Sequence, residues 1–126
     1  YKPNLSINII INEYLNSSVS SGIVNHIVVG DWNDDLSDSY NQNSFNIFLD
    51  DTSNYKYVNY DYERQGYNTA VSFPSYPSFI DHIMISKDLF EEAKNGDAQT
   101  IRIGDYISGY DQIISDHRPV VWRFTP

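Results

Sequence analysis

The sequence contains no cysteine, so disulfide bridges, thiolate zinc sites and a cysteine nucleophile are excluded. Basic residues are also scarce, because 8 Lys and Arg face 17 Asp and Glu and the formal net charge is -9. An acidic surface opposes non-specific binding to a polyanion but suits a site that gathers divalent cations. No run of about 18 apolar residues is present, so the sequence predicts no membrane-spanning helix.

What is present indicates one folded domain over residues 1–126. Hydrophobic residues make up 40% of the chain and charged residues 20%, a balance typical of a globular protein. Aromatic residues reach 15%, including 11 Tyr, which is enough to build a core. The lack of cysteine, together with many Asn, Ser and Tyr residues, suggests an exported bacterial protein. Because the chain opens with Tyr1 rather than Met, we expect a missing upstream part.

The spacing of apolar residues predicts alternating helices and strands. Offsets of three and four favour an amphipathic helix over residues 4–16, with a strand as the alternative, followed by a polar loop over 17–22. The further predicted elements are a strand over 26–29, a strand or short helix over 45–49, a Tyr-rich edge hairpin over 55–62, a turn-rich stretch over 66–77, a strand over 79–85, a helix over 87–94, and strands over 100–103 and 120–124. This order indicates an α+β or layered α/β fold.

The first of three polar segments at predicted strand ends is Gly30-Asp31-Trp32-Asn33. A carboxylate at Asp31 can hold a metal ion or orient water, and the carboxamide of Asn33 can donate to a phosphate oxygen. A polar turn accounts for the same residues equally well. An EF-hand loop beginning at Asp31 is excluded, because Leu36 stands where the turn glycine is needed and Gln42 where the bidentate glutamate is needed.

The second and third segments are Ile80-Asp81-His82-Ile83 and Ser115-Asp116-His117-Arg118-Pro119. Strand residues alternate between faces, so Asp81 and His82 cannot both enter one site. An Asp within a strand needs a partner to offset its desolvation, whereas His82 is more simply a packed or surface histidine, and His26 a structural one. His117 is a natural proton carrier, Asp81 a candidate to orient its ring, and Asp116 is then free for metal. A polar turn before the last strand is the competing interpretation.

Taken in this order, the three segments closely resemble the endonuclease/exonuclease/phosphatase family, the deoxyribonuclease-I-like group. The apolar strand before the first segment and the Val-rich strand after the last one also match. The resemblance covers nearly the whole chain but only the second half of the family's domain. It implies half of a four-layer α/β sandwich, with mostly antiparallel or mixed β-sheet and flanking helices.

The resemblance also implies hydrolysis of phosphoester bonds with Mg²⁺ or Mn²⁺, most simply by a nuclease-type phosphodiesterase. Asp31 matches the residue that orients or deprotonates water and is also a candidate metal ligand, and Asp116 matches a metal-site carboxylate. Asn33 and His117 match residues that contact the substrate phosphate, and Asp81 matches the carboxylate that orients the histidine. The family's first half supplies an Asn, a metal-binding Glu and a further His that are not matched here, so the isolated chain is expected to be inactive.

Two other functions remain open at this point. One is a non-catalytic Tyr-rich binding module, for instance for carbohydrate, and the other is a degenerate family member kept as a scaffold. Within the enzyme interpretation, the substrate is DNA, RNA, sphingomyelin or an inositol phosphate, and the negative charge argues mildly against duplex DNA. The expected partners are a phosphoester substrate, with nucleic acid as one class, and the missing N-terminal half.

Overall fold

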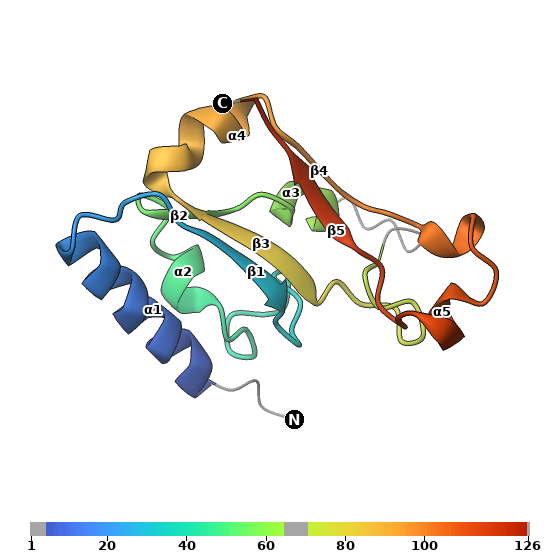
Figure 1. The fold of residues 1–126 in the computed structure, drawn as a ribbon. Helices are drawn as coiled ribbons and strands as arrows, with labels where there is room; N and C mark the ends of the chain where they lie inside the picture. The colour runs from blue at the N-terminus through green and yellow to red at the C-terminus, as the bar shows by residue number, and fades with distance from the viewer. Residues whose placement is uncertain (1–4, 65–70, 126) are drawn as a thin grey trace.

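The computed structural model describes residues 5–64 and 71–125 (Figure 1). Within these ranges the chain has a mixed α/β fold with antiparallel sheets. The elements in chain order are α1 (Leu5–Ser20), β1 (Ile27–Asp31), α2 (Asn46–Leu49), β2 (Tyr55–Tyr57), α3 (Tyr60–Arg64), β3 (Asp81–Ser86), the 3-10 turn η2 (Lys87–Leu89), α4 (Phe90–Lys94), β4 (Asp97–Thr100), the 3-10 turn η3 (Ile103–Asp105), α5 (Tyr110–Ile113) and β5 (Val120–Arg123).

Two antiparallel sheets position the polar strand ends. The first has the order β1-β3-β2, and its register sets Asp31 opposite Asp81. The second pairs β4 with β5, with Thr100 opposite Val120, and contacts between β3 and β5 join the two sheets. Because β1 runs against β3, the last residue of β1 lies beside the first residue of β3, so two acidic residues 50 positions apart meet at one sheet edge.

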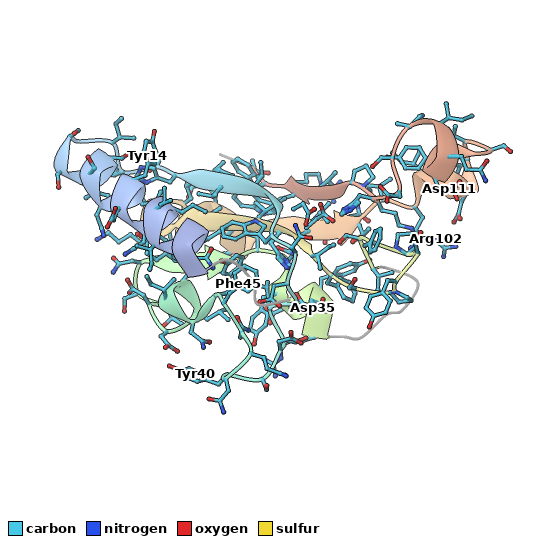
Figure 2. All side chains as sticks on the ribbon, turned by 90° about the horizontal axis from the view of Figure 1, so that it is seen from below. Tyr14, Asp35, Tyr40, Phe45, Arg102 and Asp111 are labelled. Atoms are coloured by element: carbon cyan, nitrogen blue, oxygen red, sulfur yellow. The ribbon has the colours of Figure 1, made fainter. Side chains whose placement is uncertain are left out.

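The core lies between the first sheet and the two helices α1 and α2. Its buried members are Leu15, Leu36, Phe45, Phe48, Tyr57 and Met84. The ring of Trp32 packs edge to face against Phe45, with centroids 5.5 Å apart, and so anchors the segment after β1. Figure 2 shows Phe45 inside the molecule, whereas Tyr14 and Tyr40 lie at its outside.

The opposite face of β1 is open. Val29 is 64% exposed and Ile27 is 48% exposed, although both are β-branched residues of strand β1. Their cross-strand partners on β3, Ile83 and Ile85, are buried. Among the described residues, none of the helices is long and apolar enough to cross a membrane.

Several predicted elements need correction. The first helix extends to Ser20 rather than ending at residue 16, because the Ser18 and Ser20 hydroxyls bond carbonyls four residues back and the turn comes only at Gly22, where φ is +85°. The stretch over 55–62 is no hairpin: only β2 pairs with β3, at the sheet edge, and helix α3 follows.

The ambiguous segment over 45–49 is a helix, α2, and the strand predicted over 100–103 lies earlier, as β4. Ile103 instead begins the 3-10 turn η3, and the short helix α5 was not predicted. Part of the turn-rich stretch predicted over 66–77, residues 66–70, lies outside the described residues.

Candidate active site

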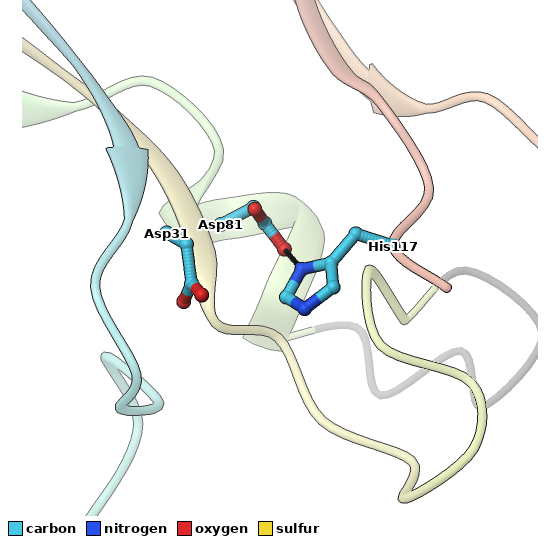
Figure 3. A group of neighbouring side chains, drawn as sticks. All are labelled: Asp31, Asp81 and His117. Atoms are coloured by element: carbon cyan, nitrogen blue, oxygen red, sulfur yellow. Dashed lines mark hydrogen bonds and ion pairs between the residues drawn. The ribbon is translucent and has the colours of Figure 1, made fainter. Parts of the chain in front are cut away.

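Three side chains from the three polar segments converge at the edge of the first sheet. Asp31 ends β1, Asp81 begins β3, and His117 lies on the segment that leads into β5. One carboxylate oxygen from each aspartate and one ring nitrogen of the histidine all lie within 4.8 Å of one another (Figure 3). The structure therefore brings together three of the five residues that the sequence singled out.

A hydrogen bond of 2.8 Å joins His117 Nδ1 to Asp81 Oδ2. A carboxylate only accepts, so Nδ1 carries a proton and donates, and the ring's other nitrogen, Nε2, is left for chemistry. Partial burial lowers the pKa of His117, but the hydrogen bond to Asp81 and the charges of Asp81, Asp31 and Asp116 outweigh it, so the pKa lies above its ordinary value. This pair can hold a proton near neutral pH, and the fixed orientation of the ring sets the direction in which Nε2 can donate it.

The ring of His117 is also held from its face. Phe73 lies against it with ring centroids 4.9 Å apart and planes inclined by 33°. The backbone N–H of His117 donates to Ser115 Oγ at 3.1 Å. The sequence predicts only a turn for the segment of Phe73, because contacts between residues so far apart in sequence leave no local pattern.

The first motif forms a tight polar turn at the end of β1. The N–H of Asn33 donates to Asp31 Oδ1 at 2.9 Å, and Asn33 has φ of +55°, a left-handed conformation that Asn tolerates better than most residues. Trp32 fixes this turn to β3, because its N–H donates to Ile80 O at 2.7 Å and its indole N–H to His82 O at 3.3 Å. Asn33 itself is exposed, and it is not among the residues that line the two pockets at the site.

Asp116 is not a member of the converging group. It is exposed, and it lines a pocket of about 400 Å³ that adjoins a second pocket of about 240 Å³. Asp31 and Asp81 line the smaller pocket, and His117 borders both. The site is thus an open, acidic depression in which His117 lies between the two pockets.

The residues fit a hard divalent cation as part of its binding site. Mg²⁺ prefers oxygen ligands, keeps several waters and needs only one or two protein carboxylates. The exposed carboxylate of Asp31 offers such a ligand, whereas Asp81 already accepts the proton of His117. Asp31 is therefore the carboxylate of the cluster that would hold an ion, with Asp81 kept for the histidine, whereas Asp116, predicted as a second ligand, lies outside the cluster.

His82 faces away from this site. It is only 1% exposed, and Nε2 lies 2.9 Å from Asp34 O while Nδ1 lies 2.9 Å from Asn59 Nδ2. The amide oxygen of Asn59 accepts from Ile83 N–H, so its NH₂ group must donate to Nδ1, and His82 is neutral with its proton on Nε2. It is a packed structural histidine.

Glu63 is a buried acid that the sequence did not reveal. It is 4% exposed, its Oε1 accepts from Ser37 N–H at 2.8 Å, and its Oε2, which accepts no hydrogen bond among the described residues, lies 3.9 Å from His82 Nδ1. Burial raises the pKa of Glu63 to about 7, against the lowering effect of the Ser37 bonds. Burial likewise lowers the pKa of His82 to about 4.

These two groups should act on stability in opposite directions. Glu63 stabilises the fold fully below pH 4.5 and loses that contribution as pH rises to about 7. His82 stabilises it fully above pH 6.5 and loses that contribution as pH falls to about 4. Each shift corresponds to about 3 kcal/mol, so the two slopes largely cancel between pH 4.5 and 6.5.

In Glu63→Gln, the pH dependence of the free energy of unfolding that His82 contributes should no longer be cancelled. We expect the free energy of unfolding of the variant to rise with pH between 4.5 and 6.5, by up to about 3 kcal/mol, where the unchanged chain is nearly flat. Urea denaturation at half-unit pH steps measures both curves. Parallel curves for the two proteins would show that Glu63 does not titrate in this window.

The three converging residues come from segments up to 86 positions apart in sequence, so it is the fold that brings them together. No family model, curated protein or solved structure matches this chain.

Proposed function

We propose that this chain is the C-terminal half of a divalent-metal phosphoesterase domain, with nuclease-type hydrolysis of phosphodiesters as its activity. The observation that carries the proposal is the 2.8 Å bond between His117 and Asp81, with Asp31 in the same cluster. A polar group with only a structural role would have its hydrogen bonds made within the protein and would be shielded from solvent. These groups instead face an open depression, with His117 and Asp81 side chains 25% and 20% exposed.

The roles follow from the positions of the side chains. Phosphoryl transfer develops negative charge on the phosphate oxygens, so the protonated ring of His117 can donate from Nε2 to one of them. Asp81 holds the ring in that tautomer and favours its charged form. Asp31 is the group that can accept a proton from water, and Asn33 the one that can donate an amide N–H to the phosphate.

A divalent ion bound at Asp31 would supply charge neutralisation and polarise the phosphate. The remaining ligands would come from the part of the domain that precedes this chain. The open face of β1 supports the same arrangement, because Ile27 and Val29 form an apolar sheet surface of the kind that a second sheet covers in a sandwich. Half of a four-layer α/β sandwich is therefore the proposed architecture.

The alternative of a Tyr-rich binding module finds little support. Tyr57 is 4% exposed, and Tyr55 and Tyr60 pack against the core, so these rings do not form an aromatic platform. Tyr67 lies outside the described residues. A scaffold that had lost catalysis would have no need for an oriented histidine beside two carboxylates.

The test is Mg²⁺-dependent hydrolysis of plasmid DNA and of bis(p-nitrophenyl) phosphate. We expect a protein that joins this chain to the preceding half-domain to cleave both, EDTA to stop cleavage, and the 126-residue chain alone to be nearly inactive. Cleavage of the small diester but not of DNA would direct the search to sphingomyelin or inositol phosphates. Failure to cleave any phosphodiester or phosphomonoester would overturn the proposed function.

A further inference from the structure

Ser72 is a fully buried serine beside the candidate active site, and it joins the two segments that carry the Asp81–His117 pair. The residue is 0% exposed. Its Oγ accepts hydrogen bonds from Ile80 N–H at 3.0 Å and from Asp81 N–H at 3.2 Å. Its carbonyl oxygen accepts from Arg118 N–H at 2.7 Å. One residue thus binds the backbone of Asp81 and that of the neighbour of His117.

The short segment around Ser72 strengthens this junction. Phe73 forms a two-way backbone bridge with Ser78, and its ring lies against His117. The guanidinium of Arg118 donates to Val71 O at 3.3 Å. Asp81 begins β3 and His117 lies on the segment that leads into β5, so the 2.8 Å bond between their side chains requires these two parts of the backbone to keep a fixed separation.

The hydroxyl has a function that a buried apolar group could not supply. Ile80 directly precedes β3 and Asp81 is its first residue, and the backbone N–H groups of both need acceptors. A hydroxyl oxygen can accept two hydrogen bonds, and Ser72 uses both. Without it, the start of β3 would lose two backbone attachments at the position from which the Asp81 carboxylate reaches His117.

We propose that Ser72 is a positioning residue that sets the separation of Asp81 and His117 and so keeps the histidine oriented. Its importance for catalysis rests on the proposed function, but its effect on His117 does not. The experiment therefore measures the histidine directly in the 126-residue chain, so that loss of the proposed function and loss of this inference can be told apart.

The tautomer of the His117 ring, read from its ¹⁵N shifts by NMR at one fixed alkaline pH, is the measurement, because the chain has only 3 His and each can be assigned with a His→Gln variant. Ser72→Ala should lower the share of neutral rings that carry the proton on Nδ1, as the bond to Asp81 lengthens. Ser72→Thr, which keeps the hydroxyl, should preserve the tautomer of the unchanged protein. If Ser72→Ala does not fold, Ser72→Cys replaces it, because sulfur is of similar size but a weaker acceptor.

Ser86→Ala is the matched control. Ser86 is also buried, at 6% exposure, and its hydroxyl accepts from His26 N–H at 2.9 Å at the opposite end of β3. Both alanine variants should lower Tm by roughly 5 °C, but only the change at Ser72 should alter the tautomer of His117. An unchanged His117 tautomer in folded Ser72→Ala or Ser72→Cys, or an equal change in Ser86→Ala, would overturn the inference.

Discussion

Replacing His117 by alanine should reduce metal-dependent phosphodiester hydrolysis by about 10³-fold, within the range lost when a positioned proton donor is removed. The side chain is 25% exposed, and among the described residues its polar partner is Asp81, at 2.8 Å. Removing it should therefore change Tm by only a few degrees while deleting the proposed proton donor. Steady-state rates and thermal unfolding on the same preparation of the complete domain separate the two effects.

His26→Ala is the control for this substitution. It removes the same kind of side chain, but His26 lies just before β1 and beside Ser86, at the end of β3 far from Asp81. We expect its rate to stay within about twofold of the unchanged enzyme, a bound set by the small coupling of distant sites. A rate unaffected by His117→Ala, or an equal loss in His26→Ala, would show that His117 has no part in the reaction.

The convergence of Asp31, Asp81 and His117 was only partly predictable from sequence. Apolar runs ending at Gly30 and spanning 79–85 predicted two strands, and alternation correctly placed Asp81 and His82 on opposite faces. The sequence did not predict that these strands pair antiparallel, which is what sets Asp31 opposite Asp81. Pairing depends on which distant strands share a core, and a local pattern does not contain that information.

The supporting residues Glu63 and Ser72 could not be predicted from the sequence for the same reason. Glu63 lies just after the Tyr-rich stretch over 55–62 that was predicted as a hairpin. Its N–H donates to Asn59 O in a helical turn, and its side chain reaches the loop after β1. Ser72 stands in a segment rich in Ser and Pro that composition marks as a turn. Both residues matter through contacts with residues 8 to 46 positions away, so nothing in their neighbours distinguishes them from surface residues.

His82→Ala should produce the opposite result to His117→Ala, a loss of stability without a loss of chemistry. The imidazole of His82 is 1% exposed and lies edge to face against Phe45 and Tyr57, with ring centroids at 5.5 and 6.0 Å. Its removal leaves a cavity and strands the Asp34 carbonyl and the Asn59 amide in the interior. Together these costs amount to about 3–5 kcal/mol, a large part of the stability of a small domain.

Urea denaturation gives the free energy of unfolding of His82→Ala, and rates corrected for the folded fraction give its chemistry. Corrected rates should match those of the unchanged enzyme, because Asp81, on the other face of β3, still holds His117. A stable variant with a rate as low as that of His117→Ala would show that His82 takes part in the reaction and that the site lies on the face of β3 that carries His82. A destabilised variant with a normal corrected rate would mean that the two neighbouring residues have separate roles, Asp81 in catalysis and His82 in the core.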